Sequence, residues 1–457
     1  MGIFLNRLIE EKHFYKRLIV LTLPIVLQSL ITSSLNMLDT LMIGSIGEIE
    51  LAAVGVANQY YFLYSLVIMG VGAGCAILIA QLWGKKDFDN IKVVLKLGVY
   101  IGTVLSILFT IVGYFFSENI IAIFNSDTQV IAVGSQYLKV TVFSYFVTAL
   151  SYVYSAALRS IGNTVLPMWA SVIALLTNAA LNAILIFGFF GAPALGALGA
   201  AYGTLCARMV ECLIILIVVM LKVNPLKVNL FERFEVSKTI AKTLYLTSMP
   251  VILNEICWGL ANVTYNIIYG RIGVEAIATT QITSTVSNLF MIMAFGLAHS
   301  SVVVVGNEVG ASNEEEAISS AKKIMKLSVL VGIIIGIGLI FISPAVVNLY
   351  GVSEAVKNDA ITILAIFAGF MVFRVYNAVL IVGIFRGGGD AKYGSIMQGI
   401  TLWTVGIPLA WMGAFVFHLP VTSVFFLGCL EEVLKFVILR RRFNSNKWIN
   451  NVVDNLA

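Results

Sequence analysis

A carboxylate and three neutral polar side chains occur within apolar segments of the first half of the chain. Asp39 has apolar residues on both sides, and Asn178 and Asn182 are four residues apart, so the two amides share a face if their segment is helical. Thr204 adds a hydroxyl in a later apolar segment. A charge that faces lipid costs at least a few kcal/mol, so Asp39 must face protein or water, or carry a proton.

These four residue types suit the binding of an ion. The carboxyl of Asp39 can titrate or bind a cation, and amide oxygens can ligate a cation or accept a hydrogen bond from a protonated carboxyl. The same residues also have a structural interpretation. Asp39 can be satisfied by neighbouring donors, and polar residues commonly form hydrogen bonds between helices in membranes.

The second half of the chain contains a different set of candidate residues. Glu255 is an acidic residue in an apolar segment, and Arg374 is a permanent positive charge in another. The two can form an ion pair or line a substrate cavity. Trp258, Tyr265 and Met291 suit an adaptable apolar cavity, although packing alone explains them too.

Two further groups of charges lie close together along the sequence. Arg208 and Glu211 are three residues apart, and Glu431 and Glu432 lie near Lys435. Charges at these spacings neutralise one another on one face of a helix. We therefore predict that both groups are mainly structural.

The sequence lacks the residue patterns of known catalytic sites. The three histidines (His13, His299 and His418) are too dispersed for a metalloprotease helix. The glycines at 387–389 lack the remaining residues of a phosphate-binding loop. We expect a protein that is not an enzyme and that needs no cofactor.

Membrane-spanning helices must position these side chains, because the composition excludes an ordinary soluble domain. Of the 457 residues, 59% are apolar and 12% are charged, whereas a soluble domain is nearer half apolar and a quarter charged. Since about 20 apolar residues cross a bilayer, we predict an all-α polytopic membrane protein with twelve transmembrane helices. The predicted spans are 16–44, 51–81, 92–116, 131–158, 165–190, 196–221, 239–270, 276–306, 318–349, 358–385, 392–417 and 421–440.

The basic residues predict the direction of the chain. Most of the 29 Lys and Arg residues fall in loops and tails on one side of the predicted spans. This bias is the positive-inside pattern, and it predicts that both termini are cytoplasmic.

An internal repeat divides the chain into two halves. Pro24 recurs as Pro250, Gly44 as Gly270 and Gly84 as Gly310, all at one constant spacing. One residue further in spacing, Arg159 recurs as Arg386 and Gly162 as Gly389. We therefore predict two six-helix lobes in a 6+6 repeat: an N-lobe (1–221, spans 1–6), a cytoplasmic inter-lobe linker (222–238), and a C-lobe with a cytoplasmic tail (239–457). Transporter sites lie within or between such repeats near mid-membrane.

Several motifs together resemble the multidrug and toxic compound extrusion (MATE) family over nearly the whole chain. They are Pro24 with Gln28 and Asp39-Thr40 in the first span, Gly-Ala-Leu-Gly-Ala-Ala-Tyr-Gly-Thr at 196–204, and the Arg-Ser-Ile-Gly-Asn-Thr and Arg-Gly-Gly-Gly-Asp turns after spans four and ten. The resemblance implies two lobes around a V-shaped cleft. It also implies a secondary active antiporter that exports drugs or organic, often cationic, compounds in exchange for H⁺ or Na⁺.

The resemblance also implies roles for individual residues. The family's N-lobe ion site uses an Asp of the first span, an Asn of the fifth and a Thr of the sixth, which match Asp39, Asn178 and Thr204. These three would form any Na⁺ site. Some members have a second Asp where this chain has Asn182, and this loss of a charge makes us favour H⁺. Gln28 supports this site or lines the substrate cavity.

Other interpretations remain at this stage. The main alternative is a flippase for a lipid-linked precursor, which has a related 6+6 architecture but needs a strongly cationic cleft. An intramembrane enzyme or a channel is a second rival. We expect a monomer in the plasma (inner) membrane, with small-molecule drugs or metabolites and the lipid bilayer as its partners and no nucleic acid.

Overall fold

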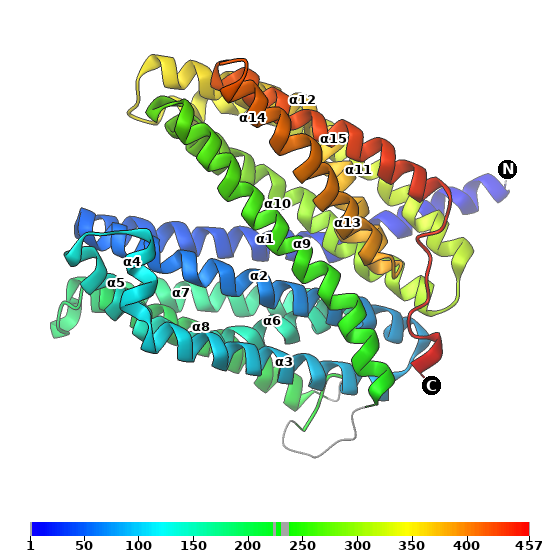
Figure 1. Ribbon diagram of the computed structural model, residues 1–457. Helices are drawn as coiled ribbons and strands as arrows, with labels where there is room; N and C mark the ends of the chain where they lie inside the picture. The colour runs from blue at the N-terminus through cyan, green and yellow to red at the C-terminus, as the bar shows by residue number, and fades with distance from the viewer. Residues whose placement is uncertain (1, 223–224, 230–236, 457) are drawn as a thin grey trace.

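The structure, a computed structural model, describes residues 2–222, 225–229 and 237–456, and every regular element within these ranges is a helix (Figure 1). The predicted inter-lobe linker (222–238) therefore lies partly outside the described residues, which lack 223–224 and 230–236. Many large apolar side chains point outward, such as Val104 at 65% and Phe341 at 78% exposure. Apolar surfaces of this kind suit contact with lipid.

The first half of the chain, which we call the N-lobe, forms eight α-helices. They are α1 (Gly2–Gly44), α2 (Glu48–Lys85), α3 (Phe88–Phe115), α4 (Ser117–Phe124), α5 (Thr128–Thr141), α6 (Ser144–Ser160), α7 (Val165–Phe187) and α8 (Ala197–Leu221), with the 3-10 turn η1 (Phe189–Gly191) before α8.

The second half, the C-lobe, contains seven α-helices and two π-helical segments. They are α9 (Lys238–Ile272), α10 (Val274–Gly310), α11 (Glu314–Val347), α12 (Glu354–Ala378), the π-helical η2 (Val379–Phe385), α13 (Ala391–Thr401), the π-helical η3 (Leu402–Gly406), α14 (Ile407–Phe415) and α15 (Val421–Asn444). A 3-10 turn, η4 (Asp454–Leu456), lies near the C-terminus.

These helices confirm the twelve predicted spans. Within the described residues, nine helices are long and apolar enough to cross a membrane, and α5 with α6 forms a tenth span that is bent by 50°. The eleventh span is divided into α13, η3 and α14, so no single piece has the full length. The twelfth, α15, carries three charges in its middle, which lower its hydropathy although its length suffices. The short helix α4 is an addition that the hydropathy pattern did not predict.

The first helix of each lobe begins against the other lobe. Leu18 and Leu21 of α1 belong to a hydrophobic core that is otherwise built by the C-lobe, and Thr22 hydrogen-bonds with Ser300 of α10 (2.7 Å). Conversely, Ile240 and Leu244 of α9 belong to a core of the N-lobe. Figure 1 shows α9 crossing from α3 towards α14.

The crossings occur near the two repeat-related prolines. Pro24 and Pro250 lie inside α1 and α9, respectively. A proline inside a helix removes one backbone hydrogen bond and permits a bend. The second part of each helix can therefore turn back to its own lobe.

The two lobes meet at the end of the molecule where α1 begins and the C-terminal segment lies, which we call the closed end. The ribbons of the lobes diverge towards the opposite end, the open end (Figure 1). At the closed end α2 crosses α10 at very short range. A Cβ atom at Gly84 would lie 2.7 Å from the carbonyl carbon of Asn307, and one at Gly310 would lie 2.5 Å from that of Gln81. Only glycine at both positions permits this crossing.

The C-terminal segment (445–456) extends from the C-lobe to the N-lobe across the closed end. Trp448 and Val453 are fully buried, and Val453 packs in a core of the N-lobe. Gln81 of α2 donates to the carbonyl of Asn450 (3.2 Å) and accepts from the backbone N–H of Val452 (2.9 Å). Lys85 donates to the carbonyl of Val453 (3.0 Å).

Candidate functional site

Four polar residues that the sequence singled out come together in the N-lobe. Asn182 donates from Nδ2 to Oδ1 of Asp39 (2.5 Å) and to Oδ1 of Asn178 (3.2 Å). Asn178 in turn donates to Oγ1 of Thr204 (3.5 Å). Both asparagines are fully buried and Asp39 is half-buried. We call this group of four residues the Asp39 cluster.

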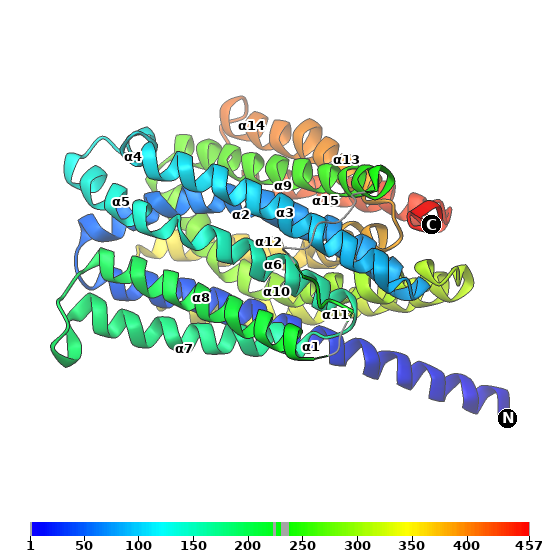
Figure 2. The ribbon, with the colours of Figure 1, turned by 90° about the horizontal axis from the view of Figure 1, so that it is seen from below.

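Close packing of α7 against α8 brings the cluster together. In Figure 2 these two helices lie side by side, with α1 beside α7. Gly199 and Gly203 of α8 face α7, where a Cβ atom would collide with the backbone of Leu185 and the side chain of Asn182. Small residues at this four-residue spacing let two membrane helices approach closely. The hydroxyl of Thr204 thereby reaches the amide of Asn178.

A chain of hydrogen bonds continues from α8 towards the closed end. Arg208 pairs with Oε2 of Glu211 (3.0 Å), as the sequence predicted, and Ser171 donates to Oε1 of the same carboxylate (2.8 Å). Gln28 donates to Ser171 (3.2 Å), and Arg159 donates to Gln28 Oε1 (3.1 Å). Gln28 therefore lies in this N-lobe network and is not among the residues that line the cavity described below.

The cluster has the groups needed to exchange a proton. Asp39 is its one carboxylate, and Glu211 nearby is already paired with Arg208. The Oδ1 atom of Asn182 is buried and has no hydrogen-bond partner among the described residues. An amide can present either a donor or an acceptor to the same neighbour, so Asn182 can donate to an ionised Asp39 and accept from a protonated one.

Glu255 has a different partner from the one suggested by the sequence. Its Oε1 atom lies 2.9 Å from Nη2 of Arg386, at the closed end between the lobes. The hypothesis of a Glu255–Arg374 pair is therefore wrong, and Glu255 is absent from the cavity that Arg374 lines. Arg386 is 5% exposed, so a neighbouring carboxylate is needed to compensate its charge.

A cavity of about 290 Å³ lies in the C-lobe. Four of the residues proposed from the sequence line it: Trp258, Tyr265, Met291 and Arg374. The remaining lining combines aromatic rings with amides and hydroxyls of α9 and α10 and with charged residues of α15. This mixture of apolar and polar groups is typical of a site for a small organic molecule.

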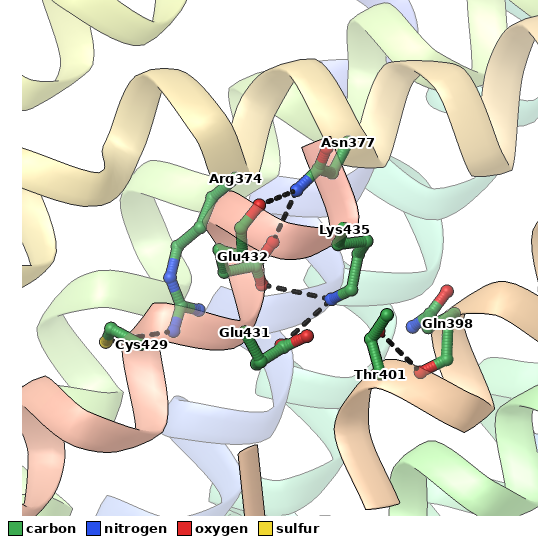
Figure 3. A network of polar contacts seen from close by, with 8 residues as sticks. All are labelled: Arg374, Asn377, Gln398, Thr401, Cys429, Glu431, Glu432 and Lys435. Atoms are coloured by element: carbon green, nitrogen blue, oxygen red, sulfur yellow. Dashed lines mark hydrogen bonds and ion pairs between the residues drawn. The ribbon is translucent and has the colours of Figure 1, made fainter. Parts of the chain in front are cut away.

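The charged residues of α15 form a compact network beside this cavity (Figure 3). Lys435 lies 2.9 Å from Glu431 and 3.3 Å from Glu432, which confirms the predicted neutralisation along one helix face. Asn377 of α12 donates to the carboxylate (2.8 Å) and to the carbonyl (2.9 Å) of Glu432. Sequence reasoning assigned these residues to structure alone and missed their position at the cavity, which depends on how α12 and α15 face each other.

Two π-helical segments contribute to the wall of the same cavity. Ile381 and Val382 of η2 and Leu402 of η3 are lining residues. A Cβ atom at Gly406, the last residue of η3, would lie 2.6 Å from the hydroxyl of Tyr265. π-Helical turns are rare and are frequently found at functional sites.

Comparisons with known proteins agree with this architecture. The model of the MatE family matches residues 24–184 and 250–412, so it covers both halves of the internal repeat. The chain is 23% identical to the uncharacterized transporter YisQ of Bacillus subtilis over 429 residues, covering 94% of each chain. It is also 23% identical to the probable multidrug resistance protein NorM of Thermotoga maritima, covering 99% of this chain and 97% of the relative.

Solved structures share the fold at low sequence identity. A MATE transporter of Vibrio cholerae, VcmN, superimposes with a TM-score of 0.88 at 18% identity, covering 97% of this chain and 99% of the other. An outward-facing multidrug resistance MATE transporter gives a TM-score of 0.87 at 20% identity, with 94% and 96% covered. The chain belongs to the MatE (multidrug and toxic compound extrusion) family of efflux transporters, and it is an integral membrane transporter rather than an enzyme.

Proposed function

We propose that this protein is a secondary active antiporter that exports small organic compounds, drugs among them, in exchange for H⁺ entering through Asp39. The observation that supports this proposal is the Asp39 cluster, in which one half-buried carboxylate faces the amide of a fully buried asparagine. Protonation of Asp39 would convert an acceptor of the Asn182 N–H into a donor to an oxygen, and so would rearrange α1 against α7. A ligand moves such an equilibrium only by binding the two states differently.

The donor set of the cluster favours H⁺ over Na⁺. Hard cations prefer several oxygen ligands with formal negative charge, and this cluster offers a single carboxylate. Asn182 presents its N–H to Asp39, an arrangement that suits a carboxylate and would need to be reversed to ligate a metal ion. Arg208, within electrostatic reach of Asp39, further disfavours an added cation.

We further propose that the N-lobe (1–221) and the C-lobe (239–457) move against each other as two bodies, with the cytoplasmic ends of α1 and α9 exchanged. The closed end is the cytoplasmic end, so both termini lie in the cytoplasm, and the monomer is the transporting unit in the plasma membrane.

The C-lobe cavity holds the substrate. Because the charged residues that line this cavity are balanced in sign, it does not favour the alternative of a flippase for a lipid-linked precursor.

Transport by everted membrane vesicles tests the coupling. With an imposed pH gradient, wild-type vesicles should accumulate a fluorescent drug, and Asp39→Asn vesicles should fall to the level of vesicles without transporter. Asp89→Asn is the matched control, because the Asp89 side chain is 95% exposed and should leave transport unchanged. Full transport by a well-expressed Asp39→Asn variant would refute the role of Asp39. If transport requires a Na⁺ gradient when the pH gradient is zero, the coupling ion is Na⁺ rather than H⁺.

A further inference from the structure

Arg374 forms no ion pair with a carboxylate of the described residues. It lies over the ring of Phe367, 4.3 Å from the ring centre, and its Nη2 donates to the Sγ atom of Cys429 at 3.6 Å. Its Nε atom is buried without a hydrogen-bond partner, and no ion pair joins Arg374 to any residue that the structure describes. A thiol is a weak acceptor, so most of the hydrogen-bonding capacity of this group is unused.

The two carboxylates nearest to Arg374 already have other partners. Figure 3 shows Lys435 between Glu431 and Glu432, and Asn377 bound to Glu432, whereas Arg374 points to Cys429. A cationic ligand would have to displace Lys435 or Asn377 from Glu432, and at Glu431, whose Oε2 atom is without a partner among the described residues, it would meet the repulsion of Lys435 on the same carboxylate. An anionic group entering the cavity would meet a guanidinium that has no such competitor.

The surroundings of Arg374 suit an organic body attached to that anionic group. Arg374 lines the cavity together with the rings of Trp258, Tyr265 and Phe295 and the flexible side chain of Met291. The volume of about 290 Å³ is close to the lower limit for pockets that hold small organic ligands. An inorganic ion would leave most of this apolar lining without a partner.

We propose that the C-lobe cavity binds amphipathic organic compounds through a carboxylate that pairs with Arg374. A planar carboxylate matches the fork of a guanidinium, and such charge-assisted pairs are about twice as strong as neutral hydrogen bonds. The aromatic part of the ligand packs against Trp258 and Phe295, and it can carry a positive charge elsewhere without changing the anchor. This inference rests on the proposed export function and specifies the class of substrate.

Equilibrium binding to the purified protein in lipid nanodiscs tests the anchor without requiring transport. The probes are radiolabelled 1-naphthaleneacetate and its neutral analogue 1-naphthaleneacetamide, which differ only in the group that would face Arg374. Wild type should bind the carboxylate at least about tenfold more tightly, which corresponds to about 1.4 kcal/mol. Arg374→Gln should lose this preference while its affinity for the amide stays the same, and Arg374→Lys should keep part of it.

The control variant is Arg440→Gln. Arg440 also lies over a phenylalanine ring, that of Phe436 at 5.6 Å, but it is exposed and outside the cavity lining. It should leave both affinities unchanged. Equal binding of the two probes to wild type, or a persisting preference in a folded Arg374→Gln protein, would overturn the proposal; thermal melting reports folding.

Asp39→Asn separates this inference from the coupling mechanism. That variant should retain the full preference for the carboxylate, because Asp39 lies in the other lobe. A preference that disappears in Asp39→Asn and persists in Arg374→Gln would place the anchor in the N-lobe and refute the proposed site. Failure of Asp39 to couple transport would leave the binding result standing.

Discussion

At the scale of single residues, the two halves of the chain compensate a matching arginine in different ways. Arg159 donates to the neutral Gln28 at 3.1 Å, whereas Arg386 pairs with the charged Glu255 at 2.9 Å. Arg159 and Arg386 are repeat-related, so the same position at the closed end is polar in one lobe and ionic in the other. Removing Glu255 from Arg386 should therefore lower the free energy of unfolding more than removing Gln28 from Arg159.

We predict that Glu255→Ala destabilises the protein by about 3–5 kcal/mol, because it leaves the buried Arg386 charge without a carboxylate. Gln28→Ala should cost less, about 1.5–3 kcal/mol, since it removes one hydrogen bond from the charged Arg159 and one neutral bond to Ser171 but no ion pair. The apparent melting temperatures of both variants in the same detergent check this difference. Equal losses would show that Glu255 does not compensate Arg386.

The residues of the Asp39 cluster could be predicted from the sequence, but their partners could be predicted only in part. Polar residues stand out in apolar segments, and the four-residue spacing of Asn178 and Asn182 placed them on one helix face. The partner of Glu255 could not be found in this way. Arg374 and Arg386 both lie in the tenth span or directly after it, and only the packing of α9 against the closed end selects Arg386.

At the scale of helices, the crossing of α2 and α10 determines how tightly the closed end shuts. Gly84 and Gly310 occupy matching positions of the repeat, and the backbone of the other helix packs directly against each of them. The arrangement is reciprocal, so widening the crossing at either glycine moves both lobes.

We predict that Gly310→Ala separates α2 from α10 and increases the population open at the closed end. Spin labels at Asp89→Cys and Glu315→Cys, in a variant without the five native cysteines, should report a longer distance. Gly369→Ala is the control, because a Cβ atom there meets no atom within 4 Å. An unchanged distance distribution in Gly310→Ala would contradict the proposed role of this crossing.

Helix positions followed from hydropathy, whereas departures from regular helix did not. The tenth and eleventh spans were predicted as continuous, yet they contain η2 and η3. A π-helical turn differs from an α-helical one by a single residue, so the apolar pattern scarcely changes. Contacts such as that between Gly406 and the Tyr265 hydroxyl, from distant parts of the chain, distinguish the two.

At the scale of the whole molecule, the C-terminal segment (445–456) joins the lobes. Gln81 hydrogen-bonds to this segment and also donates to the carbonyl of Gly387 (3.0 Å), so one N-lobe side chain holds two parts of the C-lobe. The sequence predicted a cytoplasmic tail but not this contact. The tail's few apolar residues have no regular period, and they divide between the lobes, because Trp448 packs in the core of the C-lobe and Val453 in a core of the N-lobe.

We predict that deleting residues 445–457 shifts the protein towards a state that is open at the closed end. The deletion removes the buried Trp448 and Val453 and leaves Gln81 and Lys85 without these partners. The distance between labels at positions 89 and 315 should lengthen, as in Gly310→Ala. If the deleted protein keeps the wild-type distance, the C-terminal segment does not hold the lobes together.

The exchange of the first helices between the lobes has a consequence for biogenesis. While the ribosome is still making the second half, Leu18 and Leu21 have no C-lobe core to enter, and Ile240 and Leu244 have yet to be added to the core of the N-lobe. Neither half can therefore complete its own packing as a separate polypeptide. Maturation of the first half must wait for synthesis of the second, so a stop codon near the linker should yield a quality-control substrate rather than a stable half-transporter.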